Sequence, residues 1–233
     1  KKVVEWLINK SEKISGCLVG EPTNVNQMGD TIKIGRRGSF TGSLIVKGIQ
    51  GHVGYPDLAE NPINSLLKML EPFSKIYLDK GTNEFQPSSV MITTIDVNND
   101  ASNVIPGEVK AKFNIRFNTL HSVASLKSML KNQFDAITKN YEFDYFCNAE
   151  PFLTSDEELK STLQNAITNV VSVNPKKSTT GGTSDARFIT KLCPVIEFGL
   201  VGKTMHKVDE AVSLIDLKKL NLIYSNILKN YFK

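Results

Sequence analysis

The stretch that decides the expected fold reads EVKAKFNIRFN, residues 108–118, and its side chains alternate strictly between apolar and polar. In a β-strand, successive side chains point to opposite faces of the sheet. One face of this strand would therefore carry Val109, Ala111, Phe113, Ile115 and Phe117, and the other face would be polar. The alternation predicts an antiparallel sheet with one buried face.

Strand and helix patterns on both sides of this stretch complete one expected unit. Asn61 is a suitable N-cap, and Pro62 suits the first position of a helix. The patterns predict, in chain order, a strand over 40–49, a helix over 62–73, strands over 89–97 and 108–118, a helix over 123–137 and a strand over 141–147. This β-α-β-β-α-β order is typical of a ferredoxin-like unit, with two helices on one face of four antiparallel strands. Its outer strand would be open to pairing with a partner.

The residues on either side of this unit form a different pattern. Short apolar runs predict buried strands over 16–20, 31–34 and 194–201. Helical patterns predict helices over 3–8, 155–171 and 214–231, and Ser155 and Glu158 have the spacing of a capping box. We therefore expect residues 1–38 and 151–233 to form one α/β domain, with residues 39–150 inserted into it. Since the chain opens on Lys1 and directly on a helical pattern, we also expect it to be the later part of a longer protein.

A glycine-paired segment suggests where chemistry takes place in the α/β domain. Residues 178–188 read STTGGTSDARF, and a helical pattern begins at Ser184. Backbone N–H groups that two glycines open at the start of a helix suit an anion. The strand predicted over 194–201 would bring His206 to a loop at its end, where α/β proteins keep their ligands. A plain glycine-rich turn and an ordinary loop histidine are the alternative.

Two further charged positions lie beside predicted strands. Glu21 precedes Pro22, which keeps Glu21 out of helical geometry at the end of a strand, so it is either an exposed glutamate or a metal ligand. Arg36 and Arg37 lie between two glycines. Their fork-shaped donors suit a carboxylate or a phosphate, although a hinge with solvated arginines has the same sequence.

Composition limits the possible partners. The net charge is only +4, and the lysines and arginines are scattered, which argues against a nucleic-acid surface. Cys17, Cys147 and Cys193 form no CxxC pair and suggest reduced, buried thiols. No apolar run approaches the roughly 18 residues of a membrane helix. We therefore expect neither a nucleic acid nor a membrane as partner.

Six motifs, taken together and in this order, resemble the succinyl-diaminopimelate desuccinylase family: GEPT (20–23), GRRGS (35–39), GIQGHVGYP (48–56), NVIP (103–106), GGTSDARF (181–188) and MHKVDE (205–210). This family belongs to a clan of two-zinc deacylases and exopeptidases that also includes acetylornithine deacetylase, aminoacylases and carboxypeptidases. The resemblance implies a zinc-exopeptidase-like α/β catalytic domain with an inserted ferredoxin-like dimerisation and lid domain. It implies a cytoplasmic bacterial homodimer, joined through residues 39–150.

The resemblance also implies an activity and a set of site residues. The substrate would be a small dicarboxylate amide, N-succinyl-LL-diaminopimelate, hydrolysed to succinate and LL-diaminopimelate in the synthesis of lysine and peptidoglycan precursors. Glu21 would bind one zinc ion and His206 the other, while His52 would stabilise the oxyanion in the partner subunit's site. The positions that match substrate-binding residues are Arg36, Ser39, Asn103, Arg116, Gly182 and Thr183.

The family's general base and its remaining zinc ligands match no residue of this sequence. We therefore expect the intact enzyme to hold two zinc ions, and this chain alone to hold neither both ions nor activity. Two alternatives stay open: another deacylase or aminopeptidase of the clan, or a non-catalytic dimerisation fragment. The Arg36-Arg37 pair and Asn103 favour a diacid acyl group.

Overall fold

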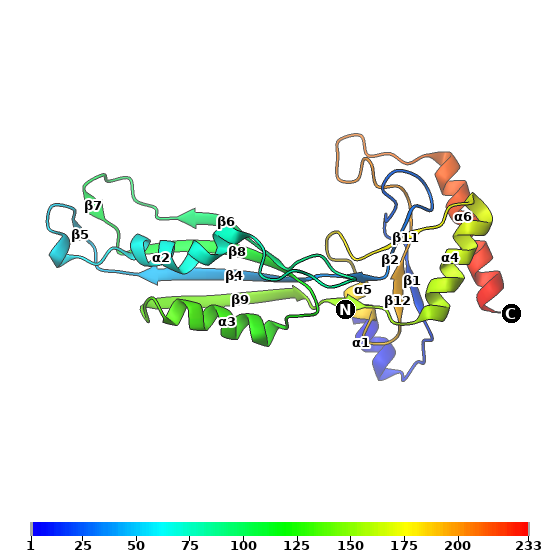
Figure 1. Cartoon of the computed structure of the whole chain (residues 1–233), viewed down its shortest axis with the longest axis horizontal. Helices are drawn as coiled ribbons and strands as arrows, with labels where there is room; N and C mark the ends of the chain where they lie inside the picture. Colours follow the sequence, from blue (N-terminus) through cyan, green and yellow to red (C-terminus); the bar gives the residue numbers. More distant parts are fainter. Residues whose placement is uncertain (1, 233) are drawn as a thin grey trace. The chain divides into compact units, whose positions relative to one another are not determined.

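The computed structural model describes residues 2–232, which divide into two units (Figure 1). We call residues Arg37–Glu150 the inserted unit, and the residues up to Arg36 and from Pro151 onward the flanking unit. Each unit has its own sheet and its own apolar core. No helix of the described chain is long and apolar enough to cross a membrane.

The inserted unit is built on a four-stranded antiparallel sheet in the order β6-β8-β4-β9 (Figure 1). The strands are β4 (Gly38–Lys47), β6 (Ser89–Asp96), β8 (Glu108–Phe117) and β9 (Tyr141–Ala149). The alternating stretch forms β8, which pairs with β4 along its whole length, from Gly38 opposite Phe117 to Lys47 opposite Glu108. The short strands β5 (Gly51–His52) and β7 (Val104–Ile105) form a separate two-stranded pair.

Two helices cover one face of this sheet. Asn61 caps α2 (Pro62–Leu70) by accepting from the backbone N–H of Ile63, and Ser122 caps α3 (Val123–Asp135) in a reciprocal capping box with Ser125. Both helices pack on the apolar face of β8, where Phe113 is fully buried. Each large side chain buried there stabilises the fold by about 1.5–3 kcal/mol. Two 3-10 turns, η1 (Pro56–Leu58) and η2 (Glu71–Lys75), complete the unit.

The flanking unit has a mixed sheet of very short strands in the order β1-β12-β2-β11. These are β1 (Cys17–Val19), β2 (Thr31–Lys33), β11 (Lys176–Ser178) and β12 (Val195–Glu197). β1 is parallel to β12 and β11 is parallel to β2, whereas β12 and β2 are antiparallel. A second pair joins β3 (Gly35–Arg36) to β10 (Phe152–Leu153).

The helices of the flanking unit are α1 (Lys2–Asn9), α4 (Glu157–Val171), α5 (Ala186–Ile189) and α6 (Leu214–Tyr231). α4 and α6 lie side by side against the sheet (Figure 1). Their buried side chains, such as Leu163 and Ile223, join Ile32 and Phe198 in one apolar cluster.

Several sequence predictions need correction at element ends. Asp156, not Ser155, caps α4, because its carboxylate accepts from the N–H of Leu159 at 2.8 Å. α2 ends at Leu70, since Pro72 has no N–H to continue the helix. The helix expected from Ser184 is a single turn that begins at Ala186.

The strand expected over 194–201 is limited to Val195–Glu197. Beyond the end of β12, Gly199 lies against the backbone of Glu21. A Cβ atom at this position would overlap the carbonyl oxygen of Glu21, so the two backbones meet at their closest approach. The three cysteines are free, but only Cys193 is buried.

Candidate active site

A cavity of about 480 Å³ in the flanking unit gathers residues from four segments. Its lining includes five of the residues predicted for the site, which come from opposite ends of the sequence: Glu21, Arg36, Gly182, Thr183 and His206. Glu21 is half-buried and His206 is exposed. The cavity therefore brings a carboxylate and an imidazole to one polar space.

Asn24 fixes the loop of Glu21 against the loop of His206. Its side-chain amide donates to the carbonyl of Gly199 at 2.6 Å, and its backbone carbonyl accepts from Gly202 at 3.1 Å. His206 itself has a φ of 62°, in the left-handed region that non-glycine residues adopt at a cost. The surrounding turn compensates that cost, because Thr204 hydrogen-bonds both the N–H and the carbonyl of Ala211.

Arg36 forms a buried ion pair with Glu197 behind the cavity. Its Nε and Nη2 both donate to Oε2 of Glu197, with Nε at 2.9 Å, and Glu197 is fully buried. Ser184 donates to the other carboxylate oxygen. A third donor of Arg36, Nη1, reaches the carbonyl of Thr180 at 3.2 Å. Arg36 therefore holds the 180–183 turn in place, besides lining the cavity.

The glycine pair shapes this turn in two different ways. Gly181 has a φ of 103°, and a Cβ there would collide with Nη1 of Arg36, so only glycine fits. Gly182 is exposed, and a Cβ there would meet no atom within 4 Å. The backbone at Gly182 is therefore open to a ligand in the cavity.

Lys33 lines the cavity and Glu197 lies behind it, and neither was among the site residues predicted from the sequence. Lys33 is 7% exposed and lines the cavity, and Nζ donates to Oγ of Ser178 at 3.0 Å and to Oγ1 of Thr180 at 2.6 Å. Burial and the neighbouring charge of Arg36 lower the pKa of Lys33 to about 8. A charged residue inside an apolar strand, as in TIKI (31–34) and VIEF (195–198), is the signal that could have found both.

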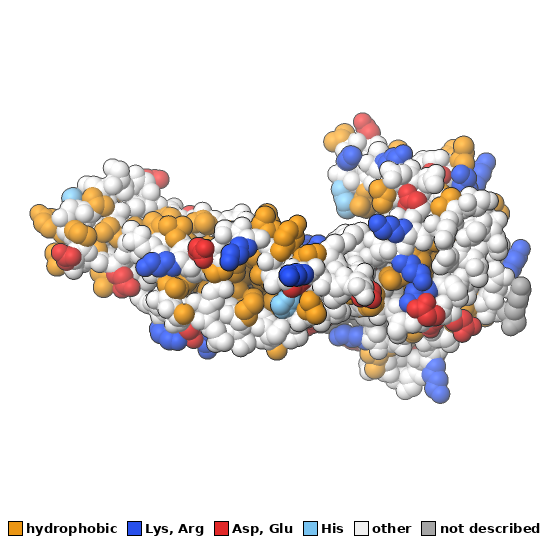
Figure 2. Space-filling view, viewed as in Figure 1, with side chains coloured by type: hydrophobic (Ala, Val, Ile, Leu, Met, Phe, Trp, Pro, Cys, Tyr) orange, Lys and Arg blue, Asp and Glu red, His pale blue; other side chains and the backbone are white. Residues whose placement is uncertain are grey.

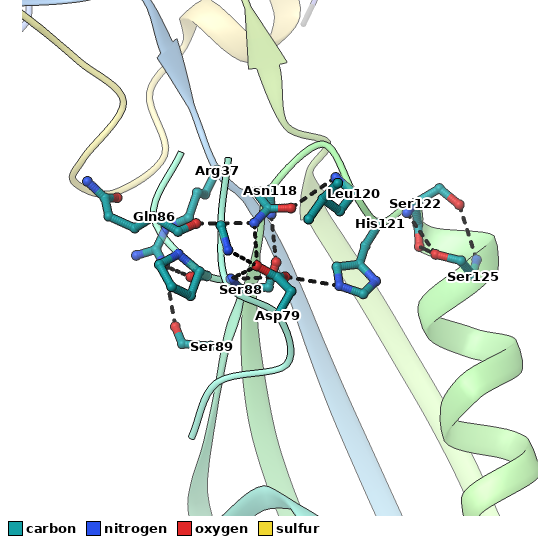
Figure 3. Close-up of polar contacts among 12 residues, drawn as sticks. Arg37, Asp79, Gln86, Ser88, Ser89, Asn118, Leu120, His121, Ser122 and Ser125 are labelled. Atoms are coloured by element: carbon teal, nitrogen blue, oxygen red, sulfur yellow. Dashed lines mark hydrogen bonds and ion pairs between the residues drawn. The ribbon is translucent and has the colours of Figure 1, made fainter. Parts of the chain in front are cut away.

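The remaining predicted residues belong to the inserted unit and form two pairs. Ser39 lies opposite Arg116 across β4 and β8, and its hydroxyl accepts from Asn114 at 3.3 Å. Arg37 is also in this unit: Nη1 donates to the carbonyl of Pro87 at 2.9 Å, close to Ser89 (Figure 3). Burial and the charge of Arg116 lower the pKa of Arg37.

His52 and Asn103 form the second pair, at the β5-β7 ladder. His52 lies opposite Val104, and the carbonyl of Asn103 accepts from Val53 at 3.1 Å. Nδ1 of His52 accepts from the N–H of Gly54 at 3.0 Å. In the neutral ring the proton is then on Nε2, and because the side chain is exposed, Nε2 is available as a donor.

Comparison with known proteins identifies the inserted part first. Residues 34–142 match the family model of the peptidase dimerisation domain, M20_dimer. Among solved structures, the chain is similar to aminopeptidase PepT from Bacillus cereus, with a TM-score of 0.80, 15% identity and coverage of 99% of this chain and 61% of that one. The M20 family metallo-carboxypeptidase Sso-CP2 from Sulfolobus solfataricus gives a TM-score of 0.75 at 13% identity, covering 97% and 66%. The predicted α/β fold class with an inserted dimerisation domain is confirmed.

Curated relatives are much closer in sequence. Succinyl-diaminopimelate desuccinylase of Pelagibacter ubique (strain HTCC1062) is 55% identical over 236 residues, covering 100% of this chain and 62% of the relative. The enzyme of the same name from Wolbachia pipientis wMel is 44% identical, covering 100% and 58%. The chain thus spans about three fifths of the length of these relatives. Along its whole length, the chain is similar to these succinyl-diaminopimelate desuccinylases.

Proposed function

We propose that this chain forms part of an enzyme that hydrolyses N-succinyl-LL-diaminopimelate to succinate and LL-diaminopimelate, a step in the synthesis of lysine and peptidoglycan precursors. The observation that carries the proposal is the cavity of the flanking unit. The cavity combines Glu21 and His206 with cationic and backbone donors. The chain that forms it is 55% identical to the succinyl-diaminopimelate desuccinylase of Pelagibacter ubique. A substrate with several carboxylates requires such donors.

Zinc is the cofactor that this proposal includes, two ions in the intact enzyme. Glu21 and His206 offer the oxygen and nitrogen donors that zinc accepts, and they line the same cavity. Within residues 2–232, however, no group of three or more His, Cys, Asp and Glu side chains could hold a metal ion. The described residues therefore do not complete a zinc site by themselves. When bound, zinc would polarise the amide carbonyl and activate water.

Calorimetric titration with zinc tests how much of the metal site this chain supplies. We expect the 233-residue chain to lack two sites of micromolar affinity, since each ion would have one protein ligand. Two such sites, both weakened by Glu21→Ala and His206→Ala, would contradict this expectation.

The chain's own residues have separate roles in the proposed reaction. The open backbone at Gly182, with Thr183 and Arg36, would bind the polar groups of the substrate in the flanking unit. Ser39, Asn103 and Arg116 of the inserted unit would bind its other polar groups. His52 would donate from Nε2 to the oxyanion that develops on the scissile carbonyl in the partner subunit's site.

We also propose a homodimer formed through residues 39–150. The match to a peptidase dimerisation domain supports it, and β6 and β9 are the two edges of the inserted sheet. Figure 2 shows apolar side chains exposed on the surface of this unit. Met91 on β6 and Phe146 on β9 are 55% and 67% exposed. Sedimentation of the intact protein as a monomer at micromolar concentration would contradict a dimer.

A direct assay tests the proposed activity. The intact protein that contains this chain, supplied with zinc, is expected to release succinate from N-succinyl-LL-diaminopimelate. Release should fall by several orders of magnitude in Glu21→Ala and His206→Ala. Equal or faster hydrolysis of the N-acetyl analogue would favour another deacylase of the clan.

A further inference from the structure

Lys33 lies where an ammonium group is costly. It is on β2, is 7% exposed, and both hydrogen-bond partners of Nζ, Ser178 and Thr180, are neutral hydroxyls. These two hydroxyls also bond to each other, at 2.9 Å. Among the described residues, no carboxylate lies within 4 Å of Nζ in an ion pair. A buried cation without a contacting anion is expensive, and the molecule retains one at this place.

Neighbouring charges do not remove this imbalance. The carboxylate of Glu197 contacts Arg36 and Ser184, so its charge is already committed to a guanidinium. Glu197 and Asp30 attract the charge of Lys33 only from a distance, and Arg36 and Lys176 repel it. In the cavity lining, Lys203 adds a further positive charge, and the carboxylate of Glu21 forms no ion pair with Lys33. The part of the cavity around Lys33 and Arg36 is therefore short of negative charge.

The ammonium group also has hydrogen-bonding capacity to spare. It has three N–H donors, and Ser178 and Thr180 use two of them. Because Lys33 lines the cavity, a ligand there can accept the third. The two hydroxyls hold Nζ in one position, so little side-chain entropy remains to be lost when an anion binds.

We propose that Lys33 is a substrate-binding residue that holds a carboxylate of the ligand in this cavity, and that the carboxylate is the free end of the succinyl group. This inference rests on the proposed function, from which it takes the identity of the diacid. A charge-assisted bond to a substrate carboxylate would give the anion that the protein itself does not provide. The same bond would discriminate against acyl groups that lack a second carboxylate.

The inference can be tested without turnover by measuring, by calorimetry, the affinity of the intact protein for each product, succinate and LL-diaminopimelate. We expect Lys33→Met to weaken succinate binding at least tenfold and to change the affinity for LL-diaminopimelate less than threefold. A loss confined to LL-diaminopimelate would overturn the choice of carboxylate. Succinate affinity that is the same in Lys33→Met, or undetectable in the unmodified protein, would overturn the whole inference.

Two further variants separate charge from structure. Thr180→Val removes one hydroxyl that positions Nζ but keeps the ammonium group, so succinate affinity should fall clearly less than in Lys33→Met. If Lys33 only ties β2 to the 178–180 segment, Thr180→Val would weaken binding as much as Lys33→Met does. If Lys33→Met fails to fold, Lys33→Arg provides a second test. It keeps the positive charge and should retain most succinate binding. Lys176→Met, at an exposed lysine on the neighbouring strand β11, is the matched control.

The kinetic result distinguishes this inference from the proposed function. In an active enzyme, Lys33→Met should lower kcat/KM for the succinyl substrate about tenfold more than for the acetyl analogue. Turnover of the succinyl substrate with unchanged succinate binding in Lys33→Met would leave the function standing and refute the role of Lys33. Succinate binding that depends on Lys33, without any turnover, would support the anion site and refute the desuccinylase.

Discussion

The two units each bury a polar cluster, and the clusters differ in how completely they are satisfied. In the inserted unit, the carboxylate of Asp79 accepts from the N–H groups of Gly81 and Ser88, from Asn118 at 2.9 Å and from His121 at 3.1 Å (Figure 3). In the flanking unit, Glu197 pairs with Arg36, while Lys33 has only neutral partners.

This difference separates a structural network from a binding site. Around Asp79, both carboxylate oxygens accept hydrogen bonds from the protein itself. Around Lys33, a charge and a donor remain, and they line a cavity. Buried polar groups that satisfy one another stabilise a fold, whereas a buried group that lacks its partner indicates the chemistry of a ligand.

Breaking the flanking cluster should have the largest effect. Glu197→Ala removes the fully buried carboxylate and leaves the guanidinium of Arg36 without its charge partner, which costs about 3–5 kcal/mol of unfolding free energy. Denaturant unfolding measures this cost. Glu142→Ala, which removes the exposed ion-pair partner of Lys47 on β9, should shift the unfolding midpoint far less. Equal shifts would mean that the buried pair contributes no more than a surface pair.

His52→Ala tests a residue whose proposed role is chemical and not structural. Because the side chain is exposed, the melting temperature should hardly change, while kcat should fall by roughly 10²-fold, as for a lost oxyanion donor. Val53→Ala, at the next exposed position, is the control. Mixed dimers of His52→Ala with Glu21→Ala should recover activity if His52 acts in the partner's site, and no recovery in verified mixed dimers would refute that arrangement.

Asp79→Asn tests the satisfied cluster. Burial raises the pKa of Asp79, but the hydrogen bonds from Ser88, Gly81 and Asn118 lower it by more, so the pKa lies below its usual 3.8. A depressed pKa contributes stability that is present above the unfolded-state pKa and lost as the pH falls through the folded-state pKa. At pH 7 the substitution should cost about 1–3 kcal/mol, and this cost should shrink in acid. The free energy of unfolding, measured at pH 7 and in acid with Asp100→Asn as an exposed control, tests this expectation. A cost that is the same at both pH values would contradict it.

Arg116→Met should have the smallest effect on the fold. Arg116 lies on the polar face of β8, opposite Ser39 and Ser89, so its removal leaves the apolar core intact. We expect kcat/KM to fall about tenfold, mostly through KM, with an unchanged melting temperature. Lys112→Met, on the same face of the same strand, should leave the kinetics unchanged. A large loss of stability with normal kinetics would make Arg116 structural.

The inserted unit could be predicted almost completely from the sequence, because its long strands alternate over many residues. β8 follows its apolar pattern along its whole length, and Asn61 and Ser122 cap the helices where expected. The flanking unit was harder to predict, since its sheet strands have only three residues each, too few for a period to be read. Lys33 and Glu197 were missed for a related reason: a charged residue inside an apolar run is an unusual feature, but a strand of three residues is too short to show whether that side chain is buried.

Asn24 has a consequence for the dynamics of the cavity. The side chain of Asn24 binds the carbonyl of Gly199 and its backbone carbonyl binds Gly202, and Gly199 lies against the carbonyl of Glu21. We therefore expect the two loops to move together at this point. The backbone amides of Asn24 and Gly202 should therefore exchange with solvent slowly and at similar rates. A metal or ligand that bridges Glu21 and His206 would then bind to loops that move as one body, and little of its binding free energy would be spent on ordering them.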